Sequence, residues 1–232
     1  MNLLQRCLAA LHPSMVGAGA ATTAPPGPYA QPALNRLYEM LFCDRPEDFA
    51  PAAGQAPAPW QAVLFGASPR PIAIRALADD SSQEPRVRAL AFDWLRRHGH
   101  EVPARRLLGV VLEVPLDGGL DVLAVYLDGS VRYLNHAAAP ALFEGPVPTL
   151  QPHVQRLLSA AQAIVDRIGP SDQPRRPAPR ENVRLNFLVS DGLYFGEGPM
   201  QTLQRDAMAG PLIDAGAALL AEVVTLTARR AR

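Results

Sequence analysis

Three Asp-Gly dipeptides, each between apolar runs, constrain the fold of this chain more than any other sequence feature. Asp-Gly between such runs favours a tight hairpin turn, because a type I′ turn needs positive φ at both central residues. Turns this short join antiparallel strands, since parallel strands need a long crossover. The turns at 117–118, 128–129 and 191–192 predict strands at 107–116, 120–127, 130–136, 183–190 and 193–196.

Apolar residues recur at helical spacing in three segments that bracket these strands: 81–99, 154–169 and 211–229. The resulting order is helix, three strands, helix, two strands, helix. This order predicts an α+β fold, in which helices pack on a five-stranded antiparallel sheet.

The N-terminal third is rich in proline and alanine, and it contains further helical segments. We expect residues 1–80 to be a helical extension that packs on an α+β core domain of residues 81–232. A short amphipathic helix is expected at residues 3–11. It is a poor export signal, because Arg6 interrupts it and no positive charge precedes it, so a cytoplasmic location is expected.

The composition excludes several classes of function. Hydrophobic residues make up 48% of the chain and the formal net charge is zero, so no global field attracts nucleic acid or an anionic membrane. All 22 basic residues are arginine, which excludes a phosphate-binding loop ending in Gly-Lys and a Schiff-base lysine. No run of about 18 apolar residues predicts a membrane span. Cys7 and Cys43 lack zinc spacing and are expected to be free thiols, so no metal and no cofactor is predicted.

The hairpin around 128–129 brings a carboxylate to a histidine. A two-residue loop pairs Leu127 with Ser130 and, at the far end, Asp121 with His136. An Asp–His pair orients an imidazole for base catalysis, or it closes a hairpin as a charge-assisted hydrogen bond. No nucleophile accompanies it, because "LVSDG" around Ser190 lacks the glycine of a nucleophile elbow. The structural interpretation is favoured, with His136, Asp121 and Glu144 kept as weak catalytic candidates.

Polar residues on the second strand of this hairpin suggest a binding face. The two-residue register places Tyr126, Tyr133 and Asn135 on one face of the sheet. A buried asparagine amide costs about 1–3 kcal/mol unless it is hydrogen-bonded, so Asn135 needs water or a specific partner. The candidate binding residues are Tyr126, Arg132, Tyr133 and Asn135.

Two resemblances accompany these patterns. The segment from Tyr126 to Asn135 resembles the Tyr-x-Asp-Gly-x-x-Arg-Tyr-x-Asn hairpin of a group of uncharacterised bacterial proteins with no known activity, in which a Ser-Gly segment and then a glutamate follow. Here Ala137–Ala139 replace the Ser-Gly segment, and Glu144 is the matching glutamate. The element order resembles the type III secretion chaperones and the roadblock/longin/profilin-like adaptor domains, which carries no function by itself.

Three functions remain open at this point. The first is a non-enzymatic cytoplasmic interaction domain, an adaptor or chaperone-like protein with a protein partner or a homodimer, without nucleic acid or membrane. It follows from the missing catalytic constellation. The second is a small hydrolase or transferase that uses Asp121 and His136. The third is a small-molecule or anion sensor built on Arg132, Tyr133 and Asn135.

Overall fold

The computed structural model of the chain describes residues 27–230, apart from residues 53, 118 and 137–139. Within these residues the fold is α+β, with seven α-helices and an antiparallel sheet. The strand order is β4-β3-β2-β1-β5-β6. The amphipathic helix expected at residues 3–11 lies outside the described residues.

The strands are β1 (Leu107–Leu116), β2 (Gly119–Tyr126), β3 (Val131–Leu134), β4 (Pro140–Phe143), β5 (Val183–Val189) and β6 (Gly192–Gly198). The helices are α2 (Pro32–Glu39), α3 (Pro59–Phe65), α4 (Pro71–Asp79), α5 (Pro85–Arg97), α6 (Gln151–Val165), α7 (Met200–Arg205) and α8 (Ala209–Arg230), with a 3₁₀ helix η1 (Pro46–Phe49).

The prediction of five strands is wrong, because the sheet has six. The additional strand is β4, which pairs with β3 at the edge of the sheet. Its sequence, Pro-Ala-Leu-Phe, contains two residues that are uncommon in strands, and no Asp-Gly turn precedes it. Proline is tolerated at the first position of an edge strand, where β4 has it.

The predicted register of the β2–β3 hairpin is also wrong, by one residue. Val125 lies opposite Val131, where the two-residue loop had placed Arg132. The loop has three residues, 127–129, and only Gly129 of these has positive φ, at 83°. A three-residue loop that ends in a left-handed glycine replaces the expected type I′ turn. Because side chains alternate along a strand, the slip moves every β3 side chain to the opposite face.

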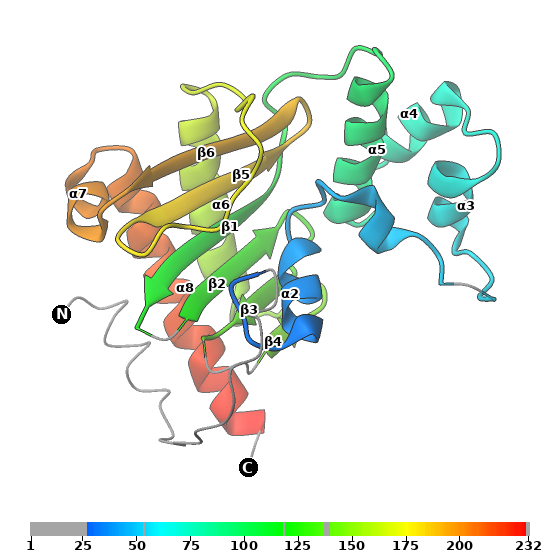
Figure 1. Cartoon of the computed structure of the whole chain (residues 1–232). Coiled ribbons are helices and arrows are strands. Elements are labelled where there is room, and N and C mark those ends of the chain that lie inside the picture. The colour runs from blue at the N-terminus through cyan, green and yellow to red at the C-terminus, as the bar shows by residue number, and fades with distance from the viewer. Residues whose placement is uncertain (1–26, 53, 118, 137–139, 231–232) are drawn as a thin grey trace.

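Helices cover both faces of the sheet (Figure 1). On one face α6 and α8 pack against alternate residues of all the central strands, and on the other α2 and α5 do so. Strand β1 is therefore buried along its first eight residues, as its continuous apolar run suggests. The core on the α6 and α8 face includes Leu112, Leu123, Leu157 and Leu219. The core on the α2 and α5 face includes Tyr38, Phe92, Val122 and Tyr126.

Tyrosine hydroxyls attach the N-terminal segment to the sheet. Tyr29 donates a hydrogen bond to the carbonyl of Leu120 at 2.9 Å, and Tyr126 donates to the carbonyl of Leu41 at 2.8 Å. Residues 29–49 thus pack directly on the central strands. The division of the chain at residue 80 stays a prediction.

Among the described residues, one helix is long and apolar enough to cross a membrane, namely α8 at Ala209–Arg229. No continuous apolar run marks it, because Asp214 and Glu222 interrupt the sequence. More than half of the apolar window is buried against the sheet and α6, which is the usual position of a core helix. Its length and composition are weak support for a membrane span.

Candidate functional site

The predicted contact between Asp121 and His136 is present. The backbone N–H and the Nδ1–H of His136 both donate to Asp121 Oδ1, each at 2.7 Å. The contact survives the register slip because β3 ends at Leu134, so that the chain beyond it turns toward Asp121. Asp121 itself is only 3% exposed. A carboxylate at this depth needs several donors to offset its lost hydration.

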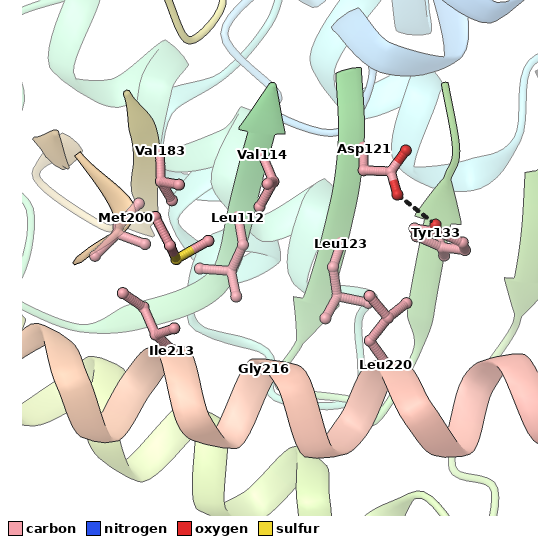
Figure 2. A pocket seen from close by; sticks show the side chains of 11 residues that line it. Leu112, Val114, Asp121, Leu123, Tyr133, Val183, Met200, Ile213, Gly216 and Leu220 are labelled. Atoms are coloured by element: carbon pink, nitrogen blue, oxygen red, sulfur yellow. Dashed lines mark hydrogen bonds between the residues drawn. The ribbon is translucent and has the colours of Figure 1, made fainter. Parts of the chain in front are cut away.

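The slip adds Tyr133 to the pair. Tyr133 lies opposite Leu123, and its hydroxyl donates to Asp121 Oδ2 at 2.6 Å (Figure 2). Burial, and then the charge of Asp121, raise the pKa of Tyr133, so the phenol stays protonated and acts as a donor. The expectation that Tyr133 shares a face with Tyr126 is therefore wrong, since the two side chains point to opposite faces.

The cavity beside this cluster is small. Figure 2 shows Asp121 and Tyr133 at its edge, with Leu112, Leu123 and the α8 residues Ile213, Gly216 and Leu220 around it. Its volume is about 20 Å³. A water molecule needs about 10–15 Å³ by this measure, so the cavity has room for no more than a water-sized group and is too small for a substrate.

The hydroxyl groups that a hydrolase would use are engaged elsewhere. Ser130 Oγ donates to Asp128 Oδ1 at 2.7 Å within the β2–β3 turn. Ser190 Oγ donates to the carbonyl of Pro103, and it accepts from the N–H of Arg106 at 3.2 Å. Neither serine contacts His136 in these hydrogen bonds. The Tyr–Asp–His cluster has the geometry to orient an imidazole, and no hydroxyl nucleophile accompanies it among these serines.

Glu144 belongs to a different cluster. Its Oε2 accepts from Arg132 Nη2 at 2.9 Å, and Glu84 Oε1 is 3.4 Å from the same nitrogen. Arg132 lies opposite Ala124, on the face that α2 and α5 cover. Its guanidinium carbon and that of Arg86 are each 5.8 Å from the centroid of the Tyr126 ring, which is cation–π range.

The four predicted binding residues therefore do not form one site. Tyr126 and Arg132 lie on one face of the sheet and Tyr133 lies on the other. Asn135 follows β3 directly and is 7% exposed. All four are buried, so none of them presents a polar surface to a ligand.

A second buried polar cluster escaped sequence reasoning. Glu113, in the middle of β1, is fully buried. Tyr38 donates to its Oε1 at 2.6 Å and Asn186 donates to its Oε2 at 2.8 Å. Burial raises the pKa of Glu113, although these donors and Arg175 oppose the shift. The only sequence signal for it is a lone glutamate within an otherwise apolar strand.

Arg175 extends this cluster to the crossover between α6 and β5. Its Nε lies 2.7 Å from Asp44 Oδ2, and its guanidinium carbon is 3.9 Å from the centroid of Phe42. The cluster thus joins the N-terminal segment, the sheet and the crossover. This arrangement stabilises the packing of α2, which contributes Tyr38 and Glu39 to it.

Among the described residues, no group of three His, Cys, Asp or Glu side chains is arranged to hold a metal ion. His98 stacks on Trp94, and Gly99 caps α5 with φ of 73°. Cys43 is a buried free thiol, whereas Cys7 lies outside the described residues. Arg96 and Arg97 both form ion pairs with Asp93, and Arg106 forms one with Asp79.

Comparison of the chain with family models, with curated proteins and with solved structures gives no match. The resemblances drawn from the hairpin motif and from the element order remain predictions.

Proposed function

We propose that this chain is a non-catalytic protein-interaction domain, of the adaptor or chaperone-like kind, whose binding element is the outer edge of β4. The observation that carries the proposal is an exposed apolar corner at this edge. Leu142 of β4 is 42% exposed, and Leu127, in the turn beside it, is 45% exposed. They are two of only three large hydrophobic residues exposed within the described residues.

The register brings these two leucines to the same end of the sheet. Leu142 lies opposite Arg132, one residue from the start of β3, and Leu127 lies in the loop that leads into β3. An edge strand carries unpaired backbone N–H and C=O groups, which a strand from another chain can pair with. An apolar side chain beside such groups adds burial to the hydrogen bonds.

The other edge of the sheet is less open to a partner strand. The carbonyl of Leu193 in β6 accepts a hydrogen bond from the N–H of Ser171, at 2.9 Å, so the crossover segment occupies part of that edge. Glu197 of β6 pairs with Arg184, which places charge at its far end. Charged side chains and covering loops are the usual protection of an edge strand.

The partner we commit to is a second copy of the chain. Two β4 edges pair antiparallel around a twofold axis, which gives a closed dimer from identical surfaces. The formal net charge of zero leaves little repulsion between two copies. Both broad sheet faces are covered by the chain's own helices, so the edge is the part of the sheet left for association.

Sedimentation of the full chain tests this proposal. We expect a monomer–dimer equilibrium with a dissociation constant on the order of 10 µM. The substitution Leu142→Arg should weaken it roughly tenfold or more, because it places a charge in the apolar centre of the contact. Ile72→Arg is the matched control, since Ile72 is 78% exposed on α4, away from the sheet edge.

Two results would overturn the proposal. One is a chain that stays monomeric well above this concentration. The other is a dimer that Ile72→Arg disrupts and Leu142→Arg leaves intact.

A further inference from the structure

A second cavity lies among the N-terminal helices, away from every residue of the sheet. It is a partly open crevice between α3, α5 and η1, with a volume of about 170 Å³. Leu64 and Leu90, which are 5% and 2% exposed, form part of its apolar lining. Phe65 and Trp94 also line it, so much of its surface is aromatic. The volume of this cavity is over eight times that of the cavity beside Asp121.

The one carboxylate that lines the cavity is paired with two arginines. Asp93 is 8% exposed, and its Oδ1 accepts from Arg96 Nη2 at 2.9 Å. Its Oδ2 lies 2.7 Å from Arg97 Nε. Arg97 also lines the cavity, so the carboxylate and this guanidinium compensate each other there. A charged ligand of either sign would have to displace one partner of this ion pair. The charges favour a neutral occupant.

Two aromatic side chains that line the cavity, Trp94 and Phe65, already contact other rings. The imidazole of His98 stacks on the Trp94 indole, with 3.8 Å between ring centroids and 14° between planes. The Nδ1–H of His98 donates to the carbonyl of Trp94 at 2.8 Å, which holds the imidazole in that position. On the other side Phe65 contacts Trp60 edge-on, at 6.3 Å between centroids. Offset-stacked and edge-to-face geometries are the ones that aromatic pairs prefer.

The size matches a single aromatic ring. An apolar cavity of about 150 Å³ in another protein stays dry and binds benzene. We propose that the crevice between α3 and α5 binds a neutral, planar aromatic ligand of about the size of one ring. The inference is independent of the proposed interaction at β4, because no residue of the crevice belongs to the sheet.

Titration of the full chain with benzene, cyclohexane and benzoate tests the inference. The chain has two tryptophans, so its NMR spectrum contains two indole N–H signals, of which Trp94→Phe identifies one. Benzene should shift the Trp94 signal saturably, with a dissociation constant on the order of 1 mM. Cyclohexane should bind up to about tenfold more weakly, because it lacks the ring quadrupole, and benzoate should not bind. A linear, unsaturated shift would overturn the inference, as would equal binding of benzoate.

Two variants locate the site. Leu64→Phe fills the cavity and should abolish saturable binding. Phe65→Ala removes one aromatic wall and should weaken binding roughly threefold to tenfold. Phe65 is partly exposed, so this variant keeps the test valid if Leu64→Phe does not fold. Ile72→Ala on α4 is the control and should bind like the parent chain. Benzene binding that neither cavity variant changes would place the ligand elsewhere.

Discussion

The buried carboxylate of Asp121 accepts three hydrogen bonds, which join the start of β2 to Tyr133 of β3 and to His136, two residues beyond that strand. The sequence predicts the Asp121–His136 contact correctly. It does not predict Tyr133 as the third member, because the face of every β3 side chain depends on whether the turn has two residues or three. A local turn preference cannot decide that difference, since both loops use Asp-Gly.

We expect Asp121→Ala to lower the free energy of unfolding by about 3 kcal/mol, because it leaves the Tyr133 hydroxyl and the His136 N–H without their acceptor. Tyr133→Phe removes the hydroxyl that donates to Asp121 Oδ2, and it leaves no buried donor without an acceptor. It should therefore lower the free energy of unfolding by only about 1 kcal/mol. Urea denaturation measures both values. Asp172→Ala, in the exposed crossover, serves as control. Equal, negligible effects of Asp121→Ala and Asp172→Ala would show that the cluster does not stabilise the hairpin.

Glu113 gives the fold a pH dependence with a definite sign. Burial raises the pKa of Glu113 in the folded chain above the ordinary 4.5. At pH values between 4.5 and the raised pKa, the folded state therefore binds more protons than the unfolded state. Its contribution to stability is therefore largest at low pH, and it falls as the pH rises from about 4.5 through the raised pKa.

The comparison of the parent chain with Glu113→Gln isolates this effect. The free energy of unfolding of the parent minus that of the variant should decrease as the pH rises from 4 toward neutrality, because glutamine does not titrate. Denaturation curves at several pH values give this difference. A difference that increases with pH would mean that the donors Tyr38 and Asn186 outweigh burial and that the pKa is lowered.

At the scale of elements, the sequence predicts the long helices and the strands that flank Asp-Gly turns, and it misses the short elements. Strand β4 and helix α7 have four and six residues, too few to show a periodicity. Both are stabilised by their neighbours: β4 by pairing with β3, and α7 by packing against α8. Tertiary contacts of this kind are invisible in a local pattern.

The β2–β3 turn can be tested through its glycine. Gly129 has φ of 83°, and a Cβ there would lie 2.6 Å from the Gln151 side chain and 3.2 Å from the Cα of Pro146. Gly99 has a similar φ of 73°, with nothing within 4 Å of a Cβ. Both alanine substitutions pay the left-handed backbone cost of about 1–2 kcal/mol. Gly129→Ala should cost more in denaturation experiments, and equal losses would mean that the neighbours of Gly129 move aside freely.

At the scale of the whole molecule, the chain's own helices cover both faces of the sheet, and hydrogen bonds within the chain hold the buried carboxylates Asp121 and Glu113. The apolar run of β1 is covered from within the chain, because α2 and α5 pack on one face of the sheet and α6 and α8 on the other. Among the described residues of the sheet and its turns, Leu127 and Leu142 at the β4 corner are the large apolar side chains that stay exposed.

Amide hydrogen exchange at low and high protein concentration tests the central claim most directly. If a second copy adds to the β4 edge, exchange at residues 141–143 and at Leu127 should slow as the concentration rises, while exchange at exposed positions of α4 stays unchanged. Exchange at residues 141–143 that is the same at every concentration, while the chain associates, would contradict the claim.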